Sequence, residues 1–271
     1  MKKALVKSML APLYLTNECK GELDDEALYG MVVDILEEYG DALKIRTPYR
    51  YESYIEKAHL CFDEGEIARY TDPAAPLKTV YRSTVDVLDG EDYQNTFIMM
   101  LTRGACVEVE KEGKPWTKLR LIGGQEGYVR TSHLGYFHRT QHGDEEHFRK
   151  NVVYWAKKYL GAQYRWGGRT PLGIDCSGLC SEAYYINGVS IYRNASIMDG
   201  FPMHEIERSQ MKEGDLLFFK GHVAMYIGND EYIHSTGRAG DDGVVVNSLD
   251  PGSPIYREDL AKGIVQIGSI F

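Results

Sequence analysis

One cysteine and two histidines follow one another in an order that suits thiol chemistry. Cys176 lies in the segment Asp175-Cys-Ser-Gly, and His222 and His234 follow downstream in the segments Gly-His-Val and Tyr-Ile-His. A cysteine thiolate attacks carbonyl carbons, while one imidazole can act as the base and a second can orient the first. The three residues therefore predict a cysteine hydrolase.

The element that must position Cys176 is expected to be a helix that begins at this residue. Residues 164–175 are rich in turn formers, whereas residues 176–185 favour a helix. At a helix N-terminus the exposed N–H groups and the helix dipole favour a thiolate, so we expect the pKa of the Cys176 thiol to fall by about one unit or more from roughly 8.5. The same N–H groups can bind an oxyanion. Cys19, Cys61 and Cys106 are expected to be buried structural cysteines.

The two histidines are expected on adjoining strands. Residues 215–220 form a short apolar run, residues 222–228 form a second, and residues 231–234 follow the turn Asn229-Asp230. Consecutive antiparallel strands bring side chains of hairpin neighbours together. The sequence thus predicts that the imidazoles of His222 and His234 lie side by side.

Composition narrows the class of partner. The chain has 271 residues, so it can bury more than one core. Because its formal net charge is −9, it is not expected to bind nucleic acid or anionic membrane surfaces. No apolar run approaches the roughly 20 residues of a membrane span. No cofactor and no metal are expected.

The compartment is predicted from the N-terminus and the cysteines. The basic N-terminal segment is interrupted by Lys7 and Ser8 and is not a convincing signal peptide. Five scattered cysteines do not form a disulfide framework. A cytoplasmic location is favoured, and a periplasmic or secreted one would follow if a leader had been removed.

The first half of the chain contains an internal repeat. Residues 30–60 align without a gap on residues 104–134, at a constant offset of 74. The identical pairs include Gly30/Gly104, Val33/Val107, Lys44/Lys118, Arg46/Arg120, Glu52/Glu126, Tyr54/Tyr128 and His59/His133. Apolar and polar residues alternate between turn signals in each copy, which predicts two small barrels of short antiparallel strands.

Five segments in the last 125 or so residues resemble, in order, the motifs of NlpC-type cell-wall peptidases. They are Tyr164-Arg-Trp-Gly-Gly, Asp175-Cys-Ser-Gly, Glu213-Gly-Asp-Leu-Leu-Phe-Phe, Gly221-His-Val-Ala-Met-Tyr-Ile-Gly and Tyr232-Ile-His-Ser. The ending of the second repeat, residues 126–134, resembles the last strand and turn of bacterial SH3-like domains. The resemblance implies two small all-β SH3-like barrels followed by an α+β papain-like catalytic domain. The expected domains are residues 1–70, 71–140 and 141–271, the last opening with a helix over residues 144–160.

The resemblance also implies roles for individual residues. Cys176 would be the nucleophile, His222 the general base and acid, and His234 the orienting residue. Tyr164 would help the Cys176 N–H group to bind the oxyanion. The implied substrate is a peptidoglycan stem peptide, cut between γ-D-glutamate and a diamino acid such as meso-diaminopimelate or L-lysine.

In the resembling subgroup, the first SH3-like domain contacts the free amine of an N-terminal L-alanine. Motif matches make Tyr51 the candidate tyrosine and Glu22 the candidate carboxylate, with Glu26 as its rival. The remaining matches at substrate-binding positions are Trp166, Asp175, Ser177 and Ser196. Ser53 replaces a glycine that is usual beside the tyrosine, and Ile197-Met198 replaces a more polar pair.

Other classes of function stay open at the level of sequence. Cys176, Cys180, His222 and His234 have spacings compatible with a zinc site. A non-catalytic wall-binding protein built on the SH3-like domains is a second alternative. A transferase is a third, because water and an amine compete for one thioester. The chain is expected to be a monomer.

Overall fold

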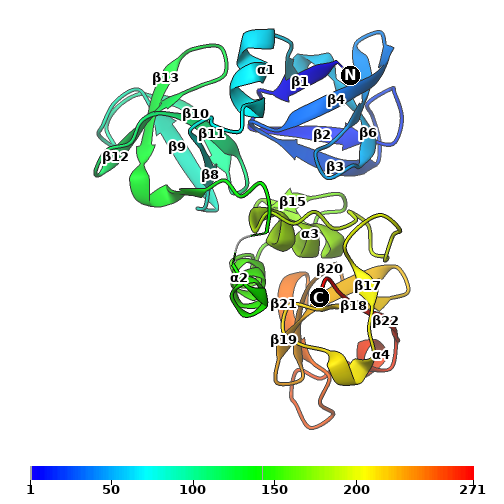
Figure 1. Ribbon diagram of the computed structural model, residues 1–271. Helices are drawn as coiled ribbons and strands as arrows, with labels where there is room; N and C mark the ends of the chain where they lie inside the picture. The colour runs from blue at the N-terminus through cyan, green and yellow to red at the C-terminus, as the bar shows by residue number, and fades with distance from the viewer. Residues whose placement is uncertain (1, 142) are drawn as a thin grey trace. The chain divides into compact units, whose positions relative to one another are not determined.

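The computed structural model describes residues 2–141 and 143–271 and divides into two compact units. The N-terminal unit ends at Phe137 and the C-terminal unit is His138–Phe271. Figure 1 shows strands dominating the first unit and a mixture of helices and strands in the second. No helix among the described residues is long and apolar enough to cross a bilayer.

The N-terminal unit contains two seven-stranded antiparallel sheets. The first has the strand order β3-β2-β6-β5-β4-β1-β7 and the second has the order β10-β9-β13-β12-β11-β8-β14. The strands of the first are β1 (Lys3–Val6), β2 (Leu10–Tyr14), β3 (Leu23–Leu28), β4 (Val32–Tyr39), β5 (Ala42–Arg46), β6 (Glu52–Glu56) and β7 (Leu60–Cys61). Those of the second are β8 (Leu77–Val80), β9 (Thr84–Leu88), β10 (Phe97–Thr102), β11 (Cys106–Lys111), β12 (Trp116–Arg120), β13 (Glu126–Arg130) and β14 (Leu134–Tyr136).

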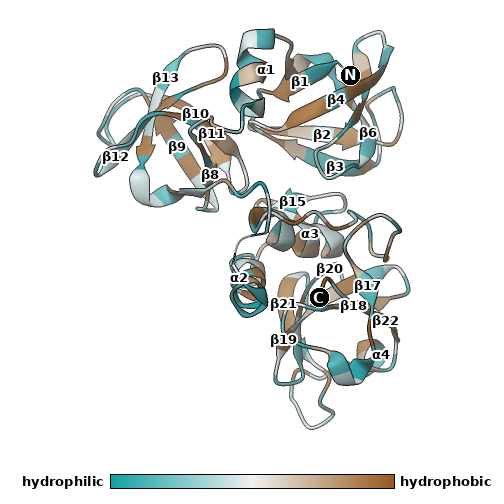
Figure 2. Cartoon of the chain, viewed as in Figure 1, coloured by the Kyte–Doolittle hydropathy of each residue, from teal (hydrophilic) through white to brown (hydrophobic). Residues whose placement is uncertain are grey.

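The internal repeat predicted from the sequence is confirmed, and it is longer than the aligned segment. Each strand of the second sheet begins 74 positions after its counterpart in the first, and a 3₁₀ turn precedes the last strand in both, at Lys57–His59 and Thr131–His133. Alternate positions of the strands supply the cores, because successive strand residues face opposite sides of a sheet. Figure 2 shows the apolar positions as brown segments along β2, β4 and β9.

The helix α1 (Glu64–Thr71) follows the first sheet and links it to the second. Asp63 caps it, with Oδ1 accepting the Glu66 N–H at 2.9 Å. Arg120 of β12 donates to both carboxylate oxygens of Glu66, at 2.8 and 2.6 Å, and Arg69 donates to Glu108 of β11 at 2.9 Å. Paired guanidinium and carboxylate groups of this kind fix α1 against the second sheet.

Gly30 lies at a close backbone contact between the two halves of this unit. The Cys106 N–H donates to the Tyr29 carbonyl at 2.9 Å. Gly30 has φ +80°, and a Cβ atom there would overlap the carbonyl oxygen of Cys106. Only glycine satisfies both the left-handed backbone and this contact.

We expect Gly30→Ala to destabilise the N-terminal unit more than Gly21→Ala does. Gly21 also has positive φ, +84°, but no described heavy atom lies within 4 Å of its ideal Cβ. Both variants incur the left-handed backbone cost of roughly 1–2 kcal/mol, and only Gly30→Ala adds an overlap with backbone atoms. Hydrogen–deuterium exchange of β4 and β11 peptides in the full chain measures the difference. Equal losses of protection in the two variants would contradict the close-approach argument.

The C-terminal unit packs helices against one six-stranded antiparallel sheet of order β17-β22-β18-β19-β20-β21. Its helices are α2 (Glu145–Lys157), α3 (Cys176–Ile186) and α4 (Glu258–Ala261). The sheet strands are β17 (His204–Glu205), β18 (Leu216–Phe219), β19 (His222–Gly228), β20 (Glu231–Thr236), β21 (Gly243–Ser248) and β22 (Ile264–Ser269). A small hairpin of β15 (Arg169–Thr170) and β16 (Gly173–Ile174) precedes α3. Helix α3 packs against α2 and against β19 and β20.

Helix α2 is anchored by a buried arginine. Arg149 donates to Asp215 Oδ1 at 2.7 Å, to the Glu213 carbonyl at 2.9 Å and to Ser269 Oγ at 3.1 Å. These bonds tie the helix to the start of β18 and the end of β22. The helix begins at the residue after its Asp144 cap but ends at Lys157, short of the predicted end at 160, in a turn closed by Gly161 with φ +78°.

Candidate active site

Helix α3 begins at Cys176, as predicted from the sequence. Asp175 caps the helix, its Oδ1 accepting the Gly178 N–H at 2.6 Å. The backbone at the cap is extended, whereas Cys176 is the first helical residue and is only 8% exposed. The thiol is therefore held at the N-terminal end of a buried helix.

A buried arginine fixes the cap, and sequence reasoning did not assign it a role. Arg193, 1% exposed, donates to both oxygens of Asp175, at 3.1 and 3.0 Å, and to Ser177 Oγ at 2.9 Å. Ser177 Oγ in turn donates to Asp175 Oδ1 at 3.0 Å. The only sequence signal was the position of Arg193 three residues before Ser196. Asp175 and Ser177 thus belong to one buried network that supports the first turn of α3.

The two histidines lie side by side, which confirms the predicted pairing. Strand β19 begins at His222, and β20 carries His234. The register that pairs Met225 with Ile233 places His222 diagonally across from His234 on the same face of the sheet. Their rings are 5.0 Å apart between centroids, and His222 Nε2 lies 2.8 Å from His234 Nδ1.

A third polar residue extends this chain, and the sequence analysis missed it. Asn247 of β21 is 6% exposed, and its Oδ1 lies 2.8 Å from His234 Nε2. The signal that could have found it is the run Val244-Val-Val-Asn, in which a polar residue follows three valines within one strand. Asn247 lies diagonally from His234, because His234 pairs with Val245 in the β20–β21 register.

Two contacts hold the cysteine segment beside the histidine strands. The Val223 N–H, next to His222, hydrogen-bonds the Cys176 sulfur. Ser235, next to His234, donates its hydroxyl to the carbonyl oxygen of Ile174 at 2.6 Å. The Cys176 thiol and the imidazoles are therefore brought to one place by residues adjacent to the cysteine segment and to each histidine.

The protonation states differ from the sequence expectation. Burial, and after it the charge of Asp175, raises the pKa of the Cys176 thiol to about 11, against the lowering contributed by N–H bonds from Val223 and Ser177. The expected lowering of this pKa is wrong, because desolvation of the thiolate outweighs the helix terminus. Burial, then the neighbouring His234, lowers the pKa of His222 to about 4. The free site therefore holds a neutral thiol beside a neutral imidazole.

Of the two aromatic residues in the 164–168 segment, Tyr164 is half-buried and Trp166 is exposed. Burial, followed by the neighbouring Cys176 and Asp175, raises the pKa of Tyr164 to about 12, so its hydroxyl stays a hydrogen-bond donor. Its backbone forms an isolated bridge to Ile174, two residues before Cys176. Trp166 is 61% exposed and offers its indole at the surface.

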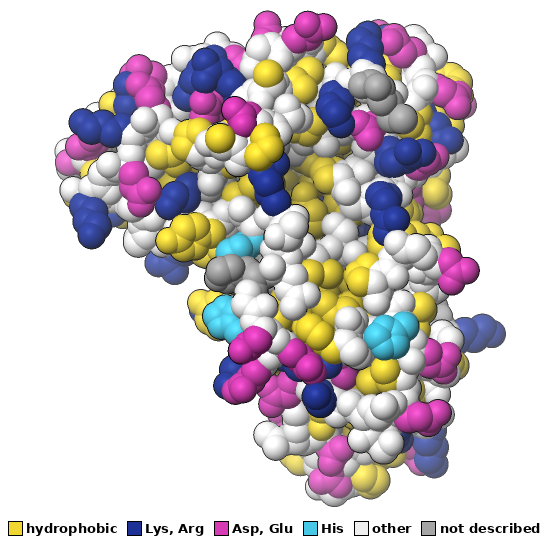
Figure 3. Space-filling view, viewed as in Figure 1, with side chains coloured by type: hydrophobic (Ala, Val, Ile, Leu, Met, Phe, Trp, Pro, Cys, Tyr) yellow, Lys and Arg dark blue, Asp and Glu magenta, His cyan; other side chains and the backbone are white. Residues whose placement is uncertain are grey.

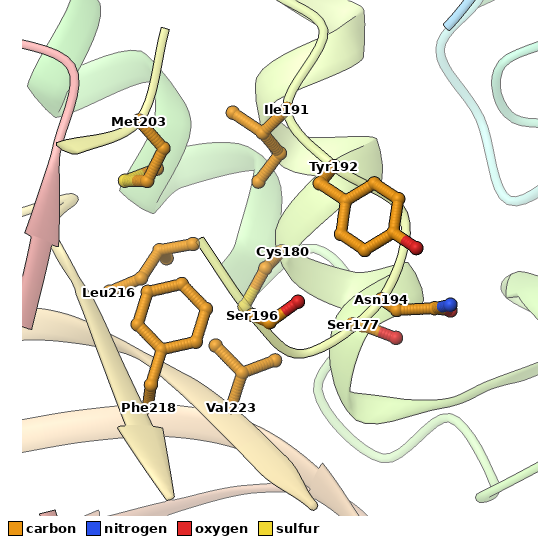
Figure 4. A pocket seen from close by; sticks show the side chains of 10 residues that line it. All are labelled: Ser177, Cys180, Ile191, Tyr192, Asn194, Ser196, Met203, Leu216, Phe218 and Val223. Carbon is orange, nitrogen blue, oxygen red and sulfur yellow. The ribbon is translucent and has the colours of Figure 1, made fainter. Parts of the chain in front are cut away.

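A pocket opens beside the first turn of α3. Figure 4 shows apolar side chains on one side of it and the polar ends of Tyr192, Asn194 and Ser177 on the other. The pocket is lined by Ser177, Cys180, Ile191, Tyr192, Asn194, Ser196, Met203, Leu216, Phe218 and Val223. It thus contains both predicted serines and shares Val223 with the surroundings of the thiol.

The four candidate zinc ligands are not assembled into a metal site. Within residues 2–141 and 143–271, no group of three or more His, Cys, Asp or Glu side chains is placed to hold a metal ion. Cys180 instead lines the pocket, and His222 and His234 are hydrogen-bonded to each other.

The predicted amine-binding residues lie in the N-terminal unit, and the structure pairs Tyr51 with a different carboxylate. The Tyr51 hydroxyl donates to Asp24 Oδ1 at 2.8 Å, and Ser53 Oγ donates to Asp24 Oδ2 at 2.5 Å. Glu22 is exposed, whereas its rival Glu26 is 3% exposed. Sequence reasoning did not single out Asp24. It did flag Ser53, which replaces the usual glycine and here supplies a hydroxyl to Asp24.

The charged surface gives no sign of a nucleic-acid site on the face that Figure 3 displays. Lys and Arg side chains alternate there with Asp and Glu side chains over both units. A nucleic-acid site requires clustered positive charge.

Comparisons with known proteins agree with this geometry. The NlpC/P60 family profile matches residues 161–257. The chain is 44% identical to "Dipeptidyl-peptidase 6" of Lysinibacillus sphaericus, over 99% of both chains. It is 27% identical to "Gamma-D-glutamyl-L-lysine dipeptidyl-peptidase" of Bacillus cereus, over 82% of this chain and 69% of that protein. A crystal structure of an NlpC/P60 family protein from Bacillus cereus has the same fold over 98% of both chains, with a TM-score of 0.80 at 19% identity.

A thiol at a helix N-terminus, packed against two adjoining strands that each carry one histidine of a hydrogen-bonded pair, defines a cysteine peptidase. With a relative 44% identical over its whole length and a matching family profile, the chain belongs to the NlpC/P60 family.

We expect alkylation of Cys176 by iodoacetamide to accelerate steadily with pH between 6 and 9. Only the thiolate reacts, and a thiol with a pKa of about 11 gains thiolate over this whole interval. Mass spectrometry of the peptide that contains Cys176 measures the rate, and Cys61, a half-buried cysteine of the N-terminal unit, is the internal reference. A rate independent of pH from 5 upward would instead reveal a thiolate–imidazolium pair.

Proposed function

We propose that this protein is a cysteine peptidase that hydrolyses the bond between γ-D-glutamate and the following diamino acid in peptidoglycan stem peptides. The observation that carries the proposal is the hydrogen-bonded pair of His222 and His234 on strands tied to the segment of Cys176. The names of the two relatives, a dipeptidyl-peptidase 6 and a γ-D-glutamyl-L-lysine dipeptidyl-peptidase, support the choice of bond.

The reaction follows from the protonation states of the site. His222 takes the proton of the Cys176 thiol as the sulfur attacks the γ-carbonyl carbon, because its lowered pKa leaves the imidazole neutral, with a free lone pair that can accept the proton. The Cys176 N–H and the Tyr164 hydroxyl bind the oxyanion. The proton then passes from His222 to the departing amine, leaving a thioester. A water molecule, deprotonated by His222, cleaves the thioester and restores the thiol.

The substrate-binding residues are proposed from the surfaces that they offer. Ser177 and Ser196 lie at the pocket next to the nucleophile, and the exposed indole of Trp166 offers a stacking surface. Asp175 supports the site through the cap and the pair with Arg193, rather than by an exposed carboxylate. Deleting Arg193 would leave the Asp175 charge buried without its partner, which is costly.

We propose that the free N-terminal amine of the substrate is recognised by Asp24 together with Tyr51 and Ser53. The carboxylate of Asp24 accepts from both hydroxyls, so it is oriented before a ligand arrives. An ammonium group would add a charge-assisted hydrogen bond to this carboxylate. Glu22, the carboxylate predicted from the motif match, is exposed and is the alternative.

The domain organisation is part of the same proposal. The two repeated sheets are assigned to SH3-like domains at residues 1–70 and 71–140, and residues 141–271 to the catalytic domain. Their equal strand order and the constant offset of 74 support two copies of one fold. The monomeric state and the cytoplasmic location stay predictions, and the proposal covers both meso-diaminopimelate and L-lysine as the diamino acid.

We expect Cys176→Ala to lower kcat/KM on L-Ala-γ-D-Glu-meso-diaminopimelate by at least about 10³-fold, because no other group supplies the nucleophile. Cys61→Ala, at a half-buried cysteine of the N-terminal unit, is the matched control and should retain activity, as should wild-type enzyme in a metal chelator. Mass spectrometry of the products measures cleavage. Full activity of Cys176→Ala would refute the peptidase mechanism, and loss of activity in chelator would favour the zinc alternative.

We expect Asp24→Asn to lower kcat/KM on the free peptide by about 10- to 100-fold, which is the loss from removing a charge-assisted hydrogen bond. Glu22→Gln is the matched control and should change it little. The N-acetylated peptide has no ammonium group, so wild-type enzyme should cut it slowly and Asp24→Asn should have no further effect on it. If Glu22→Gln caused the larger loss on the free peptide, the assignment to Asp24 would be wrong.

A further inference from the structure

His222, His234 and Asn247 form a hydrogen-bonded series, the histidine chain. The contacts of Asn247, at its buried end, indicate which ring nitrogens carry a hydrogen. The Asn247 side chain makes two contacts, one from Nδ2 to the Ile255 carbonyl at 3.1 Å and one from Oδ1 to His234 Nε2 at 2.8 Å. A backbone carbonyl can only accept a hydrogen bond, so the amide group that faces Ile255 must be the NH₂. The oxygen of Asn247 therefore faces His234, and the hydrogen-bond network sets the orientation of the amide.

The orientation of Asn247 sets the tautomer of His234. An amide oxygen can only accept, so His234 Nε2 must carry its hydrogen. Burial lowers the pKa of His234, which therefore stays neutral. The Nδ1 atom of a neutral imidazole protonated at Nε2 has a lone pair and no hydrogen. His234 Nδ1 is therefore an acceptor.

The same donor–acceptor reasoning applies to His222. Its Nε2 lies 2.8 Å from His234 Nδ1, so in the neutral ring Nε2 carries the hydrogen and donates. His222 Nδ1 is then left with a lone pair. A proton acceptor is what a base for the Cys176 thiol requires.

We propose that Asn247 is a positioning residue that fixes the Nε2–H tautomers of His234 and His222, and thereby makes His222 Nδ1 the base for Cys176. The proposal rests on the proposed peptidase function. Asn247 acts only through the histidines. In the opposite tautomer, His234 Nε2 would oppose Asn247 Oδ1 as two acceptors, in a place where His234 is 0% and Asn247 is 6% exposed.

Protons balance along this chain. The thiol proton moves to His222 Nδ1 as the carbon–sulfur bond forms, and His222 becomes an imidazolium that still donates from Nε2 to His234. The Nδ1 proton then goes to the departing amine, and the ring returns to the Nε2–H tautomer. Neither His234 nor Asn247 gains or loses a proton, because each only orients the hydrogen bonds of the chain.

The charged groups around His234 leave this assignment unchanged. Besides Asn247, the groups acting on it are Arg257, Asp241 and Asp259. Arg257 donates to Asp259 at 2.6 and 2.8 Å and to Asp241 at 3.2 Å, so the guanidinium and the two carboxylates are bonded to one another. The direction of the chain is thus set by its one amide, Asn247.

The first test is spectroscopic and needs no activity. In the full chain labelled with ¹⁵N-histidine at pH 7, two-bond ¹H–¹⁵N correlations distinguish a protonated from a bare ring nitrogen. We expect both His222 and His234 to show a protonated Nε2 and a bare Nδ1. Assignment uses the His222→Gln and His234→Gln variants. A protonated Nδ1 on either ring in the wild-type protein would overturn the proposal.

The second test is Asn247→Ala, with Ser248→Ala as the matched control. Ser248 is the next residue of β21, is 2% exposed and hydrogen-bonds the Asp230 carbonyl, but it is outside the histidine chain. We expect Asn247→Ala to lower kcat roughly 10- to 100-fold with little change in KM and to mix the tautomers of His234. Ser248→Ala should leave kcat and both tautomers as in the wild type.

The outcomes separate this inference from the proposed function. Unchanged kcat and unchanged tautomers in Asn247→Ala would overturn the inference, as would a fall in kcat without any change of tautomer, which indicates a structural role alone. If Asn247→Ala does not fold, the wild-type tautomers still decide. A wild-type protein that shows the expected tautomers but cleaves no stem peptide would refute the proposed function and leave the proton assignment intact.

Discussion

The structure of the site depends on the buried pair between Arg193 and Asp175. The guanidinium holds both oxygens of the carboxylate, and the carboxylate caps the helix whose first residue is Cys176. A buried charge of this kind is stable only when it is paired and hydrogen-bonded. The pair thus fixes where α3 begins, where the thiol lies and how the adjoining pocket is formed.

Burial then determines the chemistry that the site can perform. It keeps both the thiol and the imidazoles neutral, so the proposed mechanism begins with proton transfer to His222 rather than from an ion pair. A hydrogen-bonded series of neutral imidazoles has a direction, because each ring has one donor nitrogen and one acceptor nitrogen. Asn247 supplies that direction from a neighbouring strand, and Ser235 and Val223 keep the histidine strands beside the nucleophile.

Sequence reasoning succeeded where the signal was local. The start of α3, the adjoining strands of His222 and His234, and the repeat at an offset of 74 all follow from neighbouring residues or from periodicity. It failed at the thiol pKa, because the helix terminus is visible in the sequence and the depth of burial is not. The roles of Arg193, Asn247 and Asp24 were missed for a related reason. Each depends on contacts with residues distant in the chain.

The amino-acid sequence by itself determined the catalytic residue types, the family resemblance, and two copies of one antiparallel unit. These are properties of residue identity, spacing and alternation, which the chain carries before it folds. The tertiary structure decided which groups are charged, which carboxylate accepts the Tyr51 hydrogen bond, and which ring nitrogen of His222 is left as a proton acceptor. Those outcomes depend on desolvation and on hydrogen-bond partners from separate strands, and neither exists until the sheets have formed.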